Sequence, residues 1–204
     1  MTSIDDIMRT APVIPVLVIE DVSEARPIAE ALVAGGLRVL EVTLRTPAAM
    51  AVIAEMAKVE GAIVGAGTVL NTRDLDGAIA AGAQFIVSPG LTEGLGRAAI
   101  ASGVPFLPGI ANAGDLMRGL ELGLDRFKFF PAVASGGLPT LRALAAPFGM
   151  VRFCPTGGIT FASAPEWLAE PSVLCVGGTW LVGKSGVDAA GIEVAARAAA
   201  RLRI

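Results

Sequence analysis

Short apolar runs rich in Val, Ile, Leu or Phe alternate along this chain with longer Ala- and Leu-rich amphipathic stretches. The short runs are typical of buried strands, and the longer stretches are typical of helices that cover a sheet. The expected strands are residues 13–18, 38–44, 62–65, 84–88, 105–107, 126–130, 151–154 and 173–176. The expected helices are residues 23–34, 47–58, 72–81, 92–102, 113–122, 138–146, 161–169 and 188–202.

Regular alternation of strands and helices predicts a parallel α/β fold. Each expected strand is followed by a helix of similar length, so we expect a closed (β/α)8 TIM barrel with a short N-terminal helix. No Gly-x-Gly-x-x-Gly opens a helix after the first strand, which weakens the open dinucleotide-binding alternative. No linker or change in composition divides the chain, so we expect residues 1–204 to form a single barrel domain.

The composition decides between a soluble and a membrane protein. Apolar residues make up 53% of the chain and the mean hydropathy is +0.67, but each apolar segment is interrupted well before the ~20 residues that a membrane span requires. The chain begins with an acidic segment, whereas a signal peptide begins with positive charge. We therefore expect a soluble, cytoplasmic protein. The net charge of −3 without a Lys- or Arg-rich run argues against nucleic acid or membrane as partners.

Missing residue types restrict the chemistry. The sequence contains no histidine and no tyrosine, and lysine occurs only at positions 58, 128 and 184. His-dependent triads, His general bases and His-rich metal sites are therefore excluded. Cys154 and Cys175 lie in apolar surroundings, so we expect both to be buried structural residues.

The expected strand 38–44 carries polar residues on one face. A barrel strand points alternate residues toward the barrel axis, which puts Glu41, Thr43 and Arg45 on the interior face near the C-terminal mouth, where barrel active sites form. One alternative makes Glu41 and Arg45 a structural ion pair. Because an acid and a base are costly to bury without a task, we favour an active site.

The expected strand 126–130 contains the most informative lysine. Two phenylalanines occupy its outer face, which leaves Arg126, Lys128 and Phe130 on the interior face. We interpret Lys58 as an ordinary surface lysine, but Lys128 among phenylalanines does not fit that interpretation. Desolvation and a nearby cation such as Arg126 or Arg45 would favour the neutral amine, which can attack a ketone and form an imine.

Two glycine-rich turns follow the last two expected strands. Residues 155–159 and 177–180 each contain a Gly-Gly pair beside a threonine. Backbone N–H groups in such turns often bind phosphate in barrels, although turns need glycines for other reasons as well. Lys184 either adds charge to this pocket or is a solvated loop lysine, and we favour the second interpretation.

Small residues also follow the third and fourth expected strands. Residues 65–68 and 88–90 leave room for a ligand at the mouth of the barrel, and Thr68 can donate a hydrogen bond to a carboxylate. Ordinary turn chemistry is the alternative for Pro89 and Gly90.

Several segments together resemble the 2-keto-3-deoxy-6-phosphogluconate (KDPG) aldolase family, whose members are also active on 4-hydroxy-2-oxoglutarate. These segments are AGG at 34–36, LEVTLRT at 40–46, VGAGTVL at 64–70, SPG at 88–90, FKFFPA at 127–132 and RFCPTGGI at 152–159. They follow one another in the order that the family requires and span almost the whole chain.

The resemblance implies a class I aldolase, without metal or cofactor, that is built as a homotrimer and acts on a small 2-keto acid or phosphorylated sugar acid. It implies that Lys128 forms the Schiff base and that Glu41 is the general acid and base, acting through water. The substrate-binding residues it implies are Arg45, Thr68, Pro89, Phe130, Thr156, Gly157, Gly158, Gly177, Gly178 and Thr179. Thr179 departs from the serine expected in much of the family, and Gly183-Lys184 is a second departure.

The implied reaction cleaves KDPG to pyruvate and glyceraldehyde 3-phosphate, with 4-hydroxy-2-oxoglutarate as a further candidate substrate. The sequence does not fix the configuration preferred at C4, so a 2-dehydro-3-deoxy-6-phosphogalactonate aldolase is an alternative. A second alternative is a sugar-phosphate isomerase or decarboxylase in which Lys128 forms no covalent bond. A silent barrel that only binds an anionic metabolite is disfavoured, because such a binder needs no Glu41 facing its ligand.

Overall fold

The computed structural model describes residues 2–183 and 187–202, so Lys184 lies outside the described residues. The strands are β1 (Val13–Leu17), β2 (Val39–Thr43), β3 (Ile63–Gly67), β4 (Phe85–Val87), β5 (Phe106–Leu107), β6 (Gly109–Ile110), β7 (Arg126–Phe129), β8 (Arg152–Pro155) and β9 (Val176–Gly178). The helices are α1 (Ile4–Arg9), the 3-10 turn η1 (Val22–Glu24), α2 (Ala25–Ala34), α3 (Ala49–Met56), α4 (Thr72–Ala80), α5 (Glu93–Ser102), α6 (Ala113–Glu121), α7 (Gly137–Ala145), α8 (Ala164–Leu168) and α9 (Ala189–Ala200). Each expected strand and helix overlaps an observed one.

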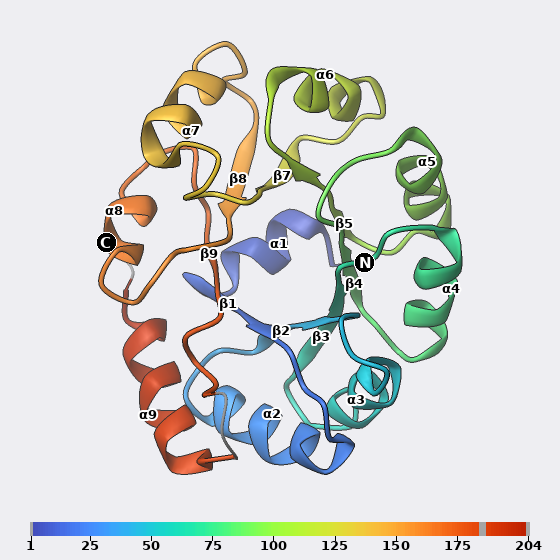
Figure 1. Ribbon diagram of the computed structural model, residues 1–204, viewed down its shortest axis with the longest axis vertical. Coiled ribbons are helices and arrows are strands. Elements are labelled where there is room, and N and C mark those ends of the chain that lie inside the picture. The colour runs from blue at the N-terminus through green and yellow to red at the C-terminus, as the bar shows by residue number, and fades with distance from the viewer. Residues whose placement is uncertain (1, 184–186, 203–204) are drawn as a thin grey trace.

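The strands form a curled parallel arrangement with helices around it. Figure 1 shows the strands as a ring seen along its axis, with α2 to α9 on the outside. The strand order is β5-β4-β3-β2-β1-β9 in a six-stranded sheet and β6-β7-β8 in a three-stranded sheet. An isolated bridge from Thr156, just after β8, to Gly177 of β9 links the two sheets, and a second bridge joins Phe153 of β8 to Val173. The predicted parallel α/β fold is therefore confirmed.

The structure does not show the single continuous eight-stranded barrel that we expected. The expected strand 105–107 continues to Ile110 and is divided at Pro108, so β5 pairs with β4 while β6 pairs with β7. Proline has no N–H to continue a ladder, and the Pro108 carbonyl instead accepts a hydrogen bond from the Lys128 N–H at 2.8 Å. At the other junction β9 begins only at Val176, which leaves isolated bridges in place of a regular ladder with β8.

Two hydrophobic clusters lie on the two sides of this ring. The larger cluster fills the space between strands and helices and includes Phe127 and Phe129, as their outer positions predict. In the smaller cluster, Ile7 and Met8 of α1 pack against residues from several strands, among them Phe85. Because α1 crosses the centre of the ring in Figure 1, this helix closes the end at which the strands begin.

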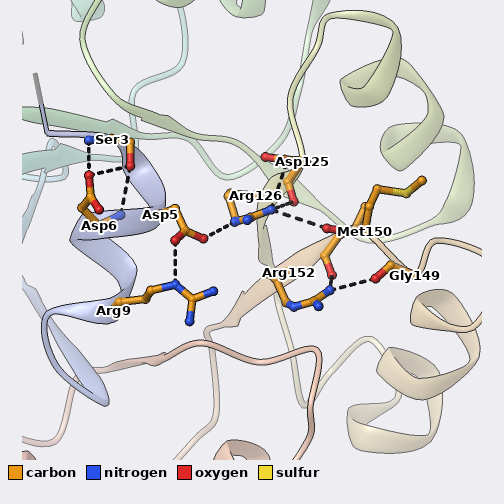
Figure 2. A network of polar contacts seen from close by, with 10 residues as sticks. Ser3, Asp5, Asp6, Arg9, Asp125, Arg126, Gly149, Met150 and Arg152 are labelled. Carbon is orange, nitrogen blue, oxygen red and sulfur yellow. Dashed lines mark hydrogen bonds and ion pairs between the residues drawn. The ribbon is translucent and has the colours of Figure 1, made fainter.

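Polar contacts hold α1 against β7 (Figure 2). Asp5 accepts hydrogen bonds from Arg126 at 2.5 Å and from Arg9 at 2.6 Å, and Arg126 also forms an ion pair with Asp125 at 3.0 Å. Our expectation that Arg126 places a positive charge beside Lys128 is therefore not met. Its guanidinium is paired with carboxylates at the start of β7.

Asparagine side chains cap the N-termini of α4 and α6. The Asn71 side chain accepts a hydrogen bond from the Asp74 N–H at 2.9 Å, and the Asn112 side chain accepts one from the Asp115 N–H at 3.0 Å. No helix within residues 2–183 and 187–202 is long and apolar enough to span a membrane.

Candidate active site

Lys128 on β7 and Glu41 on β2 meet inside the ring of strands. The Lys128 Nζ donates a hydrogen bond to the Glu41 Oε1 at 2.8 Å, and the two side chains are 7% and 4% exposed. The alternation that we expected along both strands accounts for this meeting, because it turns both side chains inward. The structure therefore brings together the two residues that the sequence predicts to be catalytic.

Burial makes this pair chemically unusual. Removing two charges from water costs several kcal/mol per ion, and their mutual attraction offsets that cost only when the geometry is good. The Phe130 ring adds a contact that favours the ammonium, because its centroid lies 5.4 Å from the Lys128 Nζ. Transfer of one proton from Nζ to Oε1 leaves a neutral amine beside a carboxylic acid, which is the pair that imine chemistry requires.

Thr43 and Arg45, which we also expected on the interior face, have different environments. Thr43 is buried and its hydroxyl donates a hydrogen bond to the Leu17 carbonyl at 2.8 Å. Arg45 is exposed beyond the end of β2, and no ion pair or hydrogen bond joins its side chain to any described residue. The alternative of a Glu41–Arg45 structural ion pair is therefore not what the structure shows. Arg45 is a cation available to a ligand at the mouth.

Three further predicted binding residues follow the ends of strands. Thr68 directly follows β3, is half-buried, and has a φ of 62°, a left-handed conformation that non-glycine residues seldom adopt. Phe130 directly follows β7 and is half-buried. Pro89 lies in the turn after β4 and is also half-buried. All three therefore lie at the end of the ring where the strands finish.

Gly109 is a residue that the sequence analysis missed. It pairs with Lys128 in the β6–β7 register. A Cβ at Gly109 would lie 2.2 Å from the Pro89 carbonyl oxygen, so only glycine allows the Pro89 turn to lie against β6. Its sequence signal is a Pro-Gly pair within an apolar run, which an ordinary turn explains equally well.

The two predicted phosphate-binding turns lie next to each other. The bridge between Thr156 and Gly177 joins them, and a Cβ at Gly177 would lie 2.2 Å from the Thr156 Oγ1. Thr156 is buried, with its hydroxyl 3.4 Å from the Cys154 carbonyl. Gly157 and Gly158 have φ values of 104° and 79°, which side chains other than glycine rarely tolerate. The backbone conformation of the first turn therefore requires glycine at these two positions.

The second turn is enclosed on one side and open on the other. Gly178 is covered by the Trp180 ring, since a Cβ at Gly178 would lie 2.2 Å from that ring. Thr179 is exposed and borders a cavity of about 680 Å³. The other residues that line this cavity are Val16, Leu17, Val18, Ile19, Glu20, Asp21, Glu24, Ile28, Val182, Gly183 and Val187. Neither Lys128 nor Glu41 is among them, so the cavity marks the rim of the candidate site and not its centre.

Metal binding finds no support in the described side chains. Within residues 2–183 and 187–202, no group of three or more His, Cys, Asp or Glu side chains is placed to hold a metal ion.

Comparisons with known proteins agree on one family. The sequence model of the KDPG and KHG aldolase family matches residues 4–196. The chain is 60% identical over 203 residues to a 2-dehydro-3-deoxy-phosphogluconate aldolase of Zymomonas mobilis subsp. mobilis, a match that covers 100% of this chain and 98% of that protein.

Solved structures give the same result. A crystal structure of the 2-keto-3-deoxy-6-phosphogluconate aldolase of Zymomonas mobilis ZM4 with 3-phosphoglycerate matches with a TM-score of 0.98 and 60% identity, over 100% of this chain and 97% of that chain. A KDPG aldolase from Legionella pneumophila, with pyruvate captured at low pH as a covalent carbinolamine intermediate, matches with a TM-score of 0.95 and 42% identity, over 98% of each chain.

Proposed function

Because the chain belongs to the KDPG and KHG aldolase family, we propose that it is a class I aldolase that cleaves KDPG to pyruvate and glyceraldehyde 3-phosphate. The observation that carries this proposal is the buried contact of 2.8 Å between the Lys128 Nζ and the Glu41 Oε1. A lysine held in this way is a nucleophile with its own proton acceptor. The covalent carbinolamine in the Legionella enzyme supports the same chemistry.

In the proposed reaction, the substrate carboxylate binds Arg45 and Thr68 while the phosphate binds the turns around Gly157 and Gly177. Pro89, Phe130, Thr156, Gly158, Gly178 and Thr179 complete the binding site. The exposed guanidinium of Arg45, which is paired with none of the described residues, and the adjacency of the two turns support this orientation. In this orientation the substrate extends from the end of β2 to the ends of β8 and β9.

Lys128 attacks the C2 ketone of the substrate as a neutral amine, and loss of water gives a protonated imine. Removal of the C4 hydroxyl proton then breaks the C3–C4 bond, whose electron pair moves toward the imine nitrogen. Glyceraldehyde 3-phosphate leaves and an enamine remains on Lys128. Protonation at C3 and hydrolysis of the imine release pyruvate and restore the lysine.

Glu41 is the acid and base of these steps. We propose that it accepts a proton from Lys128 directly and exchanges the substrate protons through water. With neither histidine nor tyrosine in the chain, Glu41 is the base best supported at this site. General acid–base assistance of this kind is typically worth about 10²–10⁴ in rate.

Two related compounds are alternative substrates. The same residues suit 4-hydroxy-2-oxoglutarate, which gives pyruvate and glyoxylate, and the galactonate-type substrate, which differs at C4. Comparing kcat/KM for KDPG, its C4 epimer and 4-hydroxy-2-oxoglutarate ranks them. KDPG is expected to rank first.

The experiment that tests the proposal traps the imine. The protein is incubated with pyruvate and borohydride, and the modified peptide is mapped by mass spectrometry. We expect a stable adduct at Lys128, an unchanged adduct in Lys58→Ala, and none at that position in Lys128→Ala. A folded wild-type protein without an adduct at saturating pyruvate would contradict the proposal and favour the sugar-phosphate isomerase or decarboxylase.

We further propose that the enzyme is a cytoplasmic homotrimer of single-domain chains. Large exposed apolar side chains on several elements, such as Met117 and Val194, support an association of subunits. Sedimentation equilibrium tests the assembly directly, and a mass of one chain at micromolar concentration would contradict it.

A further inference from the structure

Gly67 is the last residue of β3 and lies against the side chain of Glu41. We infer that Gly67 is a positioning residue for proton transfer: its missing side chain leaves the space that holds the Glu41 carboxylate against Lys128. This inference rests on the proposed function and adds a residue to it. The role follows from distances around Gly67.

The Glu41 carboxylate occupies the place that a side chain at Gly67 would take. An ideal Cβ on Gly67 would lie 2.2 Å from the Glu41 Oε1, 2.7 Å from its Cγ and 2.8 Å from its Cδ. Real Cβ atoms do not approach other heavy atoms this closely. The crowded oxygen is also the one that accepts the hydrogen bond from the Lys128 Nζ. Any substitution at Gly67 therefore acts directly on the catalytic contact.

The requirement for glycine is one of space and not of backbone conformation. Glycines with positive φ elsewhere in the described chain, such as Gly157 and Gly158, need the left-handed region, but Gly67 is not among them. Alanine can therefore adopt the backbone of Gly67. The strand register supports the same view, because Gly67 pairs with Thr43 in a regular parallel ladder.

Glu41 has little room to avoid a new methyl group. It is 3% exposed, and the neighbouring strand position in the ladder is Gly65, which is itself covered by the Phe85 ring. The carboxylate can yield only by leaving its position beside Lys128. We therefore expect Gly67→Ala to keep the nucleophile and to impair the proton transfers.

The test separates imine formation from proton transfer. Solvent exchange of the pyruvate methyl protons, followed by NMR in D2O, reports protonation and deprotonation at C3. Borohydride trapping reports the imine. In Gly67→Ala we expect methyl exchange to fall at least about tenfold, within the range of general acid–base assistance. The amount of imine trapped at Lys128 after prolonged incubation, when slower formation no longer limits it, stays within about threefold of wild type. Gly94→Ala in α5 is the control, because no atom lies within 4 Å of its Cβ position, and it is expected to match wild type in both assays.

A second pair of variants keeps the inference testable if Gly67→Ala folds poorly. In a Glu41→Ala background the crowding carboxylate is absent, so adding Gly67→Ala is expected to change neither folding nor the trapping of pyruvate. Such a non-additive result is the sign of two residues that act through one contact. A further loss of trapping in this background would overturn the inference, because Gly67 would then act independently of Glu41.

Two other outcomes also overturn it: wild-type methyl exchange in Gly67→Ala, or equal loss of exchange and trapping. Failure of the wild-type protein to trap pyruvate contradicts the proposed function instead, so the two failures are distinguishable.

Discussion

The Lys128 Nζ and the Glu41 Oε1 lie 2.8 Å apart although the two residues are separated by 87 positions in the sequence. Both side chains are less than 10% exposed. In no other ion pair among the described residues are both partner side chains buried to this degree. Removing one partner of such a pair leaves the other charge buried without compensation. The contact is therefore expected to affect both turnover and stability.

Glu41→Gln keeps the size of the side chain and removes its charge and its basicity. We expect turnover of KDPG to fall by about 10²–10⁴, the usual contribution of general acid–base catalysis, while borohydride still traps some imine at Lys128. A coupled assay of pyruvate release measures the turnover. Near-normal turnover in Glu41→Gln would contradict the role of Glu41.

Arg45→Ala is expected to weaken binding of the keto-acid carboxylate. A hydrogen bond to a charged group contributes about 1.5–3 kcal/mol, so we expect KM for KDPG to rise by roughly ten- to a hundredfold with a smaller change in kcat. Arg73→Ala is the matched control, because Arg73 is exposed on α4 and no described residue forms an ion pair with it. Equal KM values for the two variants would remove Arg45 from the binding site.

Asp5→Asn tests the attachment of α1 to β7. Removing the carboxylate is expected to lower the free energy of unfolding by about 1–2 kcal/mol, since a partly buried charged contact lies between an exposed and a buried pair in strength. Urea unfolding followed by circular dichroism measures this change. Glu93→Gln, which removes an exposed i,i+4 pair with Arg97, is the control and is expected to cost less than about 0.5 kcal/mol.

The same carboxylate predicts a dependence of stability on pH. The hydrogen bond from Arg9, assisted by Arg126, holds the pKa of Asp5 below its ordinary value. A lowered folded-state pKa contributes stability above the unfolded-state pKa, and that contribution is lost as pH falls toward the folded-state pKa. The stability difference between wild type and Asp5→Asn is therefore expected to shrink below about pH 4. A difference that is constant from pH 7 to pH 2.5 would contradict this assignment.

Cys154 and Cys175 are expected to be unreactive in the native protein. Both are buried, and a hydrogen bond with Cys154, together with burial, raises the pKa of the Cys175 thiol well above its ordinary value. Because the thiolate is the reactive form, a thiol reagent at pH 8 is expected to label both residues rapidly in denaturant and neither within minutes in the native state. Rapid labelling of the native protein would show that the smaller hydrophobic cluster, which contains both cysteines, opens readily.

Local alternation is enough to predict that Glu41 and Lys128 face the interior of the ring. A strand turns successive side chains to opposite faces whatever the rest of the fold does, and both Glu41 and Lys128 are indeed interior. Arg45 shows where this argument stops. Because β2 ends at Thr43, the alternation no longer applies two residues later, and Arg45 is exposed.

Contacts between distant segments are not visible in the local pattern. The residues near Arg126 do not indicate that Asp5, 121 positions away, will pair with it. The close approaches of Gly67 to Glu41 and of Gly109 to Pro89 also need three-dimensional coordinates, because glycine has many ordinary explanations in a turn-rich chain.

The closure of one end of the ring by α1 has a consequence for the order of events in turnover. Ile7 and Met8 pack into the end of the ring where the strands begin. Substrates and products are therefore expected to reach and leave Lys128 through the opposite end. After cleavage the pyruvate carbons are still bonded to Lys128, whereas the aldehyde fragment is held only by non-covalent contacts at that end. In the proposed reaction, cleavage therefore releases the aldehyde first and pyruvate last, and synthesis must load the two in the reverse order.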